Sequence, residues 1–149
     1  MLDHNWECLT KEAVNAYSNH AFNDAVNLNK QALSLLEVSF YDDFNHDVES
    51  TIAAASVSFL NLAESYTVLG EFVLANAQYE NAINFLQAAM MRSAVNDHQY
   101  SIIMRTLTRI RCEWQLFSQS HFSELPAQSN PLMETFSNVV SAPKKATHH

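Results

Sequence analysis

The sequence predicts an all-α protein built from antiparallel helix pairs. Apolar residues recur at steps of three and four along five successive segments, the period of a helix that buries one face. The chain has a single glycine, Gly70, and its three prolines all lie at or after Pro126. Scarce glycine disfavours tight hairpins and phosphate-binding loops, and absent proline leaves long helices uninterrupted. We therefore expect a helical domain over residues 1–125 and a proline-interrupted tail over residues 126–149.

Each predicted helix has its own apolar stripe. The stripes run from Leu2 to Tyr17, from Phe22 to Phe40, from Ile52 to Leu69, from Phe72 to Ala89 and from Tyr100 to Phe117. Asp3 and Asp97 are the expected N-caps of the first and fifth helices. In the tail, Pro131 favours a weak short helix over residues 131–140.

Seven positions of the first helix pair recur in the second at a constant separation of fifty residues, and small alanines match alanines. These are Leu9/Phe59, Ala13/Ala63, Phe22/Phe72, Ala25/Ala75, Ala32/Ala82, Leu33/Ile83 and Leu36/Leu86. Such alanines allow helix axes to approach within about 8–10 Å. The pattern predicts duplication of one helix pair, with units at about 2–41, 48–94 and 97–125.

The second unit resembles a tetratricopeptide repeat (TPR), a helix–turn–helix module. The matching positions are Phe59, Leu62, Ala63, Tyr66, Gly70, Ala75, Tyr79 and Ala82. The resemblance implies a right-handed array of about 2.5 repeats, with five long helices and a short sixth, whose first helices line a concave groove that holds a peptide. In length and layout the chain also resembles an uncharacterised group of short bacterial TPR-like proteins.

The repeat length of fifty residues exceeds the usual 34 of this family. Either the helices that flank the first junction are longer, or a loop forms around residues 42–48. We favour long helices with a short acidic connection, because loops longer than about 12–15 residues are uncommon in compact domains. Asp43, Asn45 and Asp47 have the opening spacing of a calcium loop, but Val48 replaces the required glycine and argues against one.

The resemblance implies a set of groove residues on the first helices of the three units. They are Lys11, Tyr17, Val57, Leu60, Asn61, Glu64, Ile110, Arg111, Trp114 and Phe117. Most are apolar and would be covered by a hydrophobic or amphipathic peptide, by a second protomer or by the chain's own tail, or else would simply belong to the core. Lys11, Asn61 and Arg111 form a polar column, fifty residues apart, that resembles half of a TPR clamp for a terminal carboxylate.

Charge and motif content narrow the function. With a net charge of −8, the chain lacks the basic surface typical of nucleic-acid-binding proteins. No apolar stretch reaches the length needed to span a membrane. The N-terminal residues show no secretory signal, so we expect a cytoplasmic protein. Cys8 and Cys112 show no metal or redox spacing, and we expect both to be buried thiols. The sequence shows no catalytic, cofactor-binding or metal-binding motif. The four arginines at positions 92, 105, 109 and 111 are expected to complement the acidic segment 37–49 within the chain or across a dimer, in preference to the alternative that they grip acidic residues of a partner.

These observations favour a non-enzymatic module or adaptor that binds an unidentified protein or peptide. One alternative is a holder of apolar segments, similar to the acidic TPR-containing secretion chaperones. Another is a homodimer whose groove is occupied by its own tail or by its twin.

Overall fold

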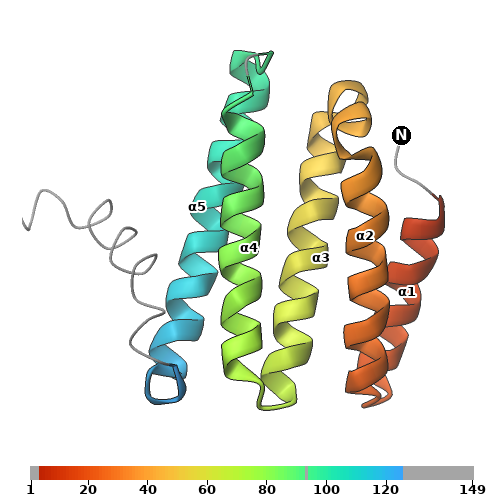
Figure 1. Cartoon of the computed structure of the whole chain (residues 1–149), viewed down its shortest axis with the longest axis vertical. Coiled ribbons are helices and arrows are strands. Elements are labelled where there is room, and N and C mark those ends of the chain that lie inside the picture. Colours follow the sequence, from red (N-terminus) through yellow and green to blue (C-terminus); the bar gives the residue numbers. More distant parts are fainter. Residues whose placement is uncertain (1–3, 93, 126–149) are drawn as a thin grey trace, which may run out of the picture.

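Five α-helices and one 3-10 turn make up the described part of the chain. The computed structural model describes residues 4–92 and 94–125. The helices are α1 (His4–Ser18), α2 (Phe22–His46), α3 (Val48–Val68), α4 (Phe72–Met90) and α5 (Asp97–Ser120), and η1 (Phe122–Glu124) follows. Figure 1 shows them side by side in chain order, with consecutive helices antiparallel. The predicted all-α architecture of antiparallel helix pairs is confirmed. The predicted cap Asp3 and the tail, with its expected helix over 131–140, lie outside the described residues.

The first junction is made by long helices. α2 continues through the acidic segment to His46, and the single residue Asp47 separates it from α3. Asp47 caps α3, because its carboxylate accepts hydrogen bonds from Ser50 N at 3.1 Å and from Ser50 Oγ at 2.8 Å. These bonds lower the pKa of Asp47. The preferred interpretation of long helices with a short acidic connection is confirmed.

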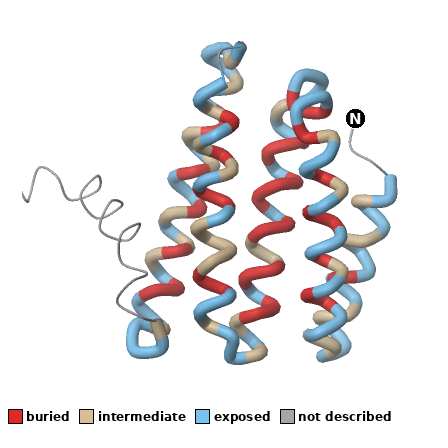
Figure 2. Tube along the Cα trace, viewed as in Figure 1, coloured by how far each residue is buried: buried red, intermediate tan, exposed pale blue. Residues whose placement is uncertain are grey.

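The duplicated positions occupy equivalent places in the core. Five of the fifty-residue pairs are buried in both copies: Ala13/Ala63, Ala25/Ala75, Ala32/Ala82, Leu33/Ile83 and Leu36/Leu86. The alanine pairs lie where side chains larger than a methyl group would push neighbouring helices apart. Figure 2 shows the buried residues forming stripes that face neighbouring helices.

Gly70 makes the turn between α3 and α4. Its φ of 75° is left-handed, a conformation that glycine adopts without steric cost. Two hydrogen bonds close the turn, from Glu71 N to Tyr66 O at 2.9 Å and from Gly70 N to Thr67 O at 3.0 Å. This pair of bonds is the Schellman motif, which satisfies the last carbonyl groups of a helix.

His20 makes the same turn between α1 and α2. Its φ is 64°, and the bonds from Ala21 N to Ala16 O at 2.8 Å and from His20 N to Tyr17 O at 3.0 Å match those of the second turn at a separation of fifty residues. Ala21 and Glu71 also share φ −89° and ψ 67°. The repeat therefore extends to the backbone geometry of the turns.

The last helix begins differently from the prediction. The N-cap of α5 is Asn96 instead of Asp97, which is the first helical residue. Asn96 Oδ1 accepts from Gln99 N at 2.8 Å, and Gln99 Oε1 accepts from Asn96 N at 3.0 Å. This reciprocal capping box satisfies two free N–H groups at once, which explains why asparagine is the cap.

Two further surface features bear on the sequence predictions. Both cysteines, Cys8 and Cys112, are exposed, so the prediction of two buried thiols is wrong. They lie on the solvent sides of their helices, where the apolar stripes are not. None of the helices in the described ranges is long and apolar enough to cross a membrane.

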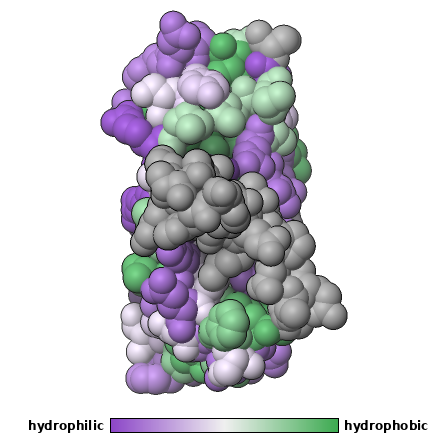
Figure 3. Space-filling model, turned by 90° about the vertical axis from the view of Figure 1, so that its left-hand side faces the viewer, coloured by the Kyte–Doolittle hydropathy of each residue, from purple (hydrophilic) through white to green (hydrophobic). Residues whose placement is uncertain are grey.

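Apolar side chains also remain on the outer surface. Met91, Leu116 and Phe122 are 80%, 64% and 71% exposed. Figure 3 looks at the left-hand side of Figure 1 and shows hydrophobic residues in separate groups among hydrophilic ones. Scattered apolar residues of this kind are ordinary on protein surfaces and do not by themselves indicate a binding site.

Because Gly70 and His20 share a left-handed turn conformation, removing the glycine from one turn and adding a glycine to the other should change the free energy of unfolding in opposite directions. Gly70→Ala is expected to lower the free energy of unfolding by about 1–2 kcal/mol, because alanine is strained at positive φ although no atom lies within 4 Å of the new Cβ. His20→Gly is expected to raise it by about 0.5–1 kcal/mol, after loss of the ring contact with Phe22. Urea unfolding measures both changes. Equal signs for the two variants would contradict the equivalence of the turns.

Candidate functional site

Four exposed or half-buried residues of α3 form a continuous strip, which we call the α3 face. They are Val57, Leu60, Asn61 and Glu64. Their spacing of three and four residues places them on one side of the helix. Each lines a hollow between α3 and a neighbouring helix. The structure therefore brings together the four α3 residues that were predicted to line a groove.

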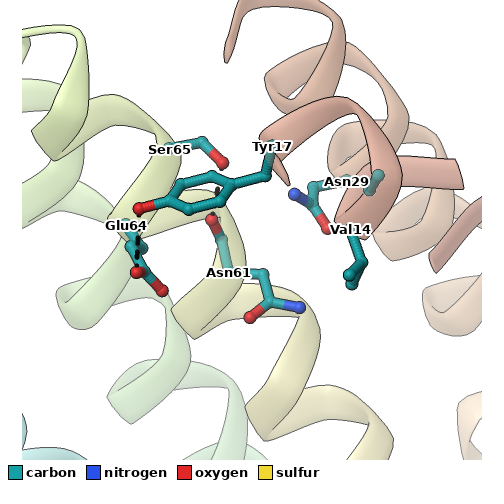
Figure 4. A pocket seen from close by; sticks show the side chains of 7 residues that line it. Val14, Tyr17, Asn29, Asn61, Glu64 and Ser65 are labelled. Atoms are coloured by element: carbon teal, nitrogen blue, oxygen red, sulfur yellow. Dashed lines mark hydrogen bonds between the residues drawn. The ribbon is translucent and has the colours of Figure 1, made fainter. Parts of the chain in front are cut away.

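The first hollow, the α1/α3 hollow, has a volume of about 200 Å³ (Figure 4). It is lined by Ala13, Val14, Tyr17, Asn29, Asn61, Glu64 and Ser65. The Tyr17 hydroxyl crosses from α1 to α3 and donates to Glu64 Oε1 at 2.9 Å. Burial raises the pKa of Tyr17, and the hydrogen bond to Glu64 raises it further. Tyr17 therefore remains a hydrogen-bond donor that orients the carboxylate.

The second hollow, the α3/α5 hollow, lies on the other side of Glu64 and has a volume of about 380 Å³. It is lined by Leu60, Glu64, Thr67, Tyr79, Glu113, Leu116, Phe117, Ser120 and His121. Its rings contact each other, with centroids 5.1 Å apart for Tyr79 and Phe117 and 5.0 Å apart for Phe117 and His121. The hollow thus combines two carboxylates with an aromatic wall.

The pKa of Tyr79 responds to burial and to the negative charge of this hollow. Burial raises its pKa to about 12, and the carboxylates of Glu113 and Glu64 add to the shift. Glu113 Oε2 is itself buried and has no hydrogen-bond partner among the described residues. The nearest described cation is Arg109, whose Nε lies 3.9 Å away, an ion-pair distance that is too long for a hydrogen bond.

The third hollow, the arginine hollow, lies nearer the start of α3 and has a volume of about 260 Å³. It is lined by Glu49, Ile52, Ala53, Ser56, Val57, Ile102, Arg105, Thr106 and Arg109. The arginines of α5 therefore border the α3 face beside Val57, and carboxylates border it around Glu64.

Two places bear on the predicted complementarity between the arginines and the acidic segment, and neither is an ion pair among the described residues. Arg105 and Arg109 share the arginine hollow with Glu49. The guanidinium carbon of Arg92 lies 3.7 Å from the centre of the Tyr41 ring, so this arginine joins the end of α4 to α2. Arg92 therefore contacts the acidic segment through the face of the Tyr41 ring, and the charge pairing of the arginines with that segment stays a prediction.

Three predicted groove residues on α5 are core residues. Ile110 and Trp114 are 0% and 1% exposed, and Phe117 is 7% exposed, with only its edge on the α3/α5 hollow. Assigning Ile110 and Trp114 to an open groove is therefore wrong. The Trp114 indole N–H donates to Asn76 Oδ1 of α4 at 2.7 Å, in a buried hydrogen bond.

The physical reason is a change in the buried side of α5. Leu60 and Glu64 of α3 are accessible, whereas their counterparts fifty residues later, Ile110 and Trp114, are buried. Arg109, whose counterpart Phe59 is buried, has a side chain that is 72% exposed. α5 packs on both α3 and α4 and turns its apolar stripe toward them, so the fifty-residue register does not extend to its groove positions.

The polar column does not gather at one place. Asn61 lines the α1/α3 hollow, whereas Lys11 is exposed on α1 and Arg111 is half-buried on α5. Neither Lys11 nor Arg111 lines any of the three hollows described above. This arrangement gives no support to a clamp for a terminal carboxylate.

Sequence reasoning missed several residues that line the hollows, chiefly Asn29 on α2, Tyr79 on α4 and Glu113 on α5. Asn29 and Tyr79 are fifty residues apart and both reach the hollows from second helices of a pair. One signal was available, since Asn29 interrupts the apolar stripe of α2 between Ala25 and Ala32. A polar residue at a core position needs a partner or a function.

No metal site accompanies these hollows. The described residues contain no group of three or more His, Cys, Asp or Glu side chains that could hold a metal ion. The acidic segment with calcium-loop spacing is helical, and Asp43 is buried there and accepts from Ser39 Oγ at 2.8 Å. A helix cannot wrap its oxygens around Ca²⁺ as a loop does.

The core role of Trp114 predicts a stability defect. Trp114→Phe should lower the free energy of unfolding by at least about 2 kcal/mol, because it removes the donor to buried Asn76 and leaves a void. Trp6→Phe is the matched control: the Trp6 indole donates to Ser58 Oγ at 3.0 Å in a half-buried place, and its loss should cost about 0.5–1.5 kcal/mol. Urea unfolding distinguishes the two. A smaller loss for Trp114→Phe would contradict its placement in the core.

The raised pKa of Tyr79 predicts an alkaline loss of stability. The unfolded chain releases this proton near pH 10 and the folded chain near pH 12, so stability present below pH 10 is lost as the pH rises between these values. The loss should be about 1–2 kcal/mol, less than a full two-unit shift would give, because the ring is partly exposed. Tyr79→Phe should flatten the dependence of urea midpoint on pH in this range. Exposed Tyr100→Phe is the control, and an equal flattening there would contradict the role of burial.

Comparison with known proteins places the chain in a family without assigning a function. No curated protein matches it. No solved structure matches it either. One family model covers residues 4–147, which include all five helices. The chain belongs to the family described as "Protein of unknown function (DUF2753)".

Proposed function

We propose that this protein is a non-enzymatic binding module that holds a segment of another protein along the α3 face. The observation that carries the proposal is the set of three hollows on one side of α3, with Glu64 shared by two of them. Separate hollows along one helix suit successive side chains of a peptide better than a single compact ligand.

Apolar side chains on the α3 face supply affinity for such a segment. Val57 is 42% exposed and Leu60 is half-buried at the edge of the α3/α5 hollow. Covering apolar area gains roughly 25 cal/mol per Å². The resemblance to TPR proteins supports this interpretation, because α1 and α3 correspond to the helices that line the peptide groove in that family.

The charges along the α3 face would set the direction in which a segment binds. The arginine hollow contains Arg105 and Arg109, whereas the hollows around Glu64 contain carboxylates. A segment with an acidic residue and a basic residue would pair with both regions in one direction only. Charge complementarity of this kind fixes the register of a bound chain more than it raises affinity.

A displayed peptide library tests the proposal. Peptides are selected on the immobilised protein and then titrated as synthetic peptides by calorimetry. Val57→Asp and Leu60→Asp should each weaken binding at least about tenfold, because they place a charge in a contact that must lose water. Val38→Asp is the matched control, since Val38 is 89% exposed on α2 and lines none of the three hollows.

Two outcomes would overturn the proposal. One is that no peptide is enriched over an empty surface. The other is that selected peptides bind the Val57→Asp and Leu60→Asp variants as tightly as the parent while circular dichroism shows all variants folded. Light scattering is run in parallel on both variants, because a dimer that these substitutions dissociate would show that a second copy, rather than a peptide, occupies the face.

A further inference from the structure

Asn29 carries an unsatisfied hydrogen-bond acceptor beside the α1/α3 hollow. The residue is 2% exposed, and its Oδ1 has no hydrogen-bond partner among the described residues. Buried polar atoms are nearly always paired, since leaving one unpaired forfeits its hydration without replacement. Because Asn29 lines the hollow, a donor within the hollow would complete it.

Glu64 supplies a second acceptor group in the hollow. In Figure 4 the Asn29 amide points toward the space between Tyr17 and Asn61, with Glu64 on the far side of the tyrosine ring. Glu64 Oε1 accepts from the Tyr17 hydroxyl, which leaves Oε2 for another donor. The hollow therefore offers an amide oxygen and a carboxylate, and carries no basic side chain in its lining.

Part of the lining is apolar, and Asn61 and Ser65 complete it. Ala13 and Val14 line one side, and the Tyr17 ring lines another. A volume of about 200 Å³ exceeds the roughly 30 Å³ share of one water molecule several times over and suits one long side chain. An apolar stem with a flat, donor-rich end is the shape that these walls fit.

We propose that the α1/α3 hollow receives an arginine side chain of the segment bound on the α3 face, a proposal that rests on the proposed function. The guanidinium group carries five donors in a plane, enough for Asn29 Oδ1 and Glu64 together, and its faces stack on aromatic rings such as Tyr17. A lysine ammonium is a compact, strongly hydrated charge that cannot match such separated acceptors in one plane. A net charge of −8 further favours a cationic partner.

Titration with a small arginine probe tests this proposal. N-acetyl-arginine methylamide is added to ¹⁵N-labelled protein, and the side-chain amide signals of Asn29 and Asn61 are followed by NMR. Roughly millimolar binding is expected for one side chain. The lysine analogue should bind more weakly, and the neutral citrulline analogue should not bind measurably. Equal shifts with arginine, lysine and citrulline, or no shift at Asn29 and Asn61, would overturn the proposal.

Matched variants separate the site from general electrostatics. Glu64→Gln should weaken the arginine probe about tenfold, because it removes the carboxylate of the hollow. Glu113→Gln removes the same charge from the neighbouring α3/α5 hollow and should change affinity less than about twofold, because Glu113 does not line the α1/α3 hollow that receives the probe. Asn29→Asp should tighten binding. If Asn29→Asp does not fold, the glutamate pair still decides the result, and equal losses in both glutamine variants would overturn the proposal.

The peptide selection distinguishes failure of the arginine site from failure of the proposed binding module. Peptides that bind the α3 face but tolerate replacement of every arginine by citrulline would overturn the arginine site and leave the binding module intact. A failed selection combined with probe binding at Asn29 would overturn the module and leave a cation-binding hollow. Selected peptides whose affinity depends on one arginine, and on Glu64 rather than Glu113, would support both.

Discussion

The packing of α3 against α2, α4 and α5, together with its hydrogen bonds to α1, is the constraint on which the rest of the structure depends. α3 packs on α2, α4 and α5. It is joined to α1 by hydrogen bonds from Trp6 to Ser58 and from Tyr17 to Glu64. A helix surrounded in this way must present small side chains, and Ala54, Ala55, Ala63, Ser58 and Ser65 are all buried. Buried hydroxyls need partners: Ser58 accepts from Trp6, and Ser65 donates to the carbonyl of Asn61 at 2.9 Å.

Because three sides of α3 are occupied, its remaining exposed residues form a narrow strip. The strip is bordered by α1 on one side and α5 on the other, and both borders leave hollows where side chains of different length meet. Glu64 lies at the centre and contributes to the hollows on both sides. The same central position that stabilises the fold therefore concentrates the candidate binding chemistry on α3, where a rigid, well-packed helix holds the side chains in place.

The local rules predicted what depends on nearby residues or on repetition. The helix stripes and the alanine contacts follow from the spacing of apolar and small residues, and Gly70 lies between two predicted stripes, where the conformational freedom of glycine suits a turn. The α3 strip was predicted from the resemblance to a tetratricopeptide repeat, which implied the groove positions. The prediction that Ile110 and Trp114 of α5 line a groove was wrong. It assumed that α5, the first helix of the third unit, keeps the orientation of α3, the first helix of the second unit, whereas α5 turns its apolar stripe toward α3 and α4. No rule of spacing within α5 reveals that rotation.

The sequence by itself determined the helix count of the described part, the duplication and the acidic character of the chain, since each of these depends on local chemistry or on internal repetition. Only the tertiary structure decided which of the predicted groove residues are accessible, and that Asn29 and Tyr79, from second helices of their pairs, reach the same face as Glu64. The physical reason is that accessibility and the meeting of side chains across helices depend on the rotation of each helix about its own axis. That rotation is set by the sum of its contacts with every neighbour, which no single stretch of sequence contains.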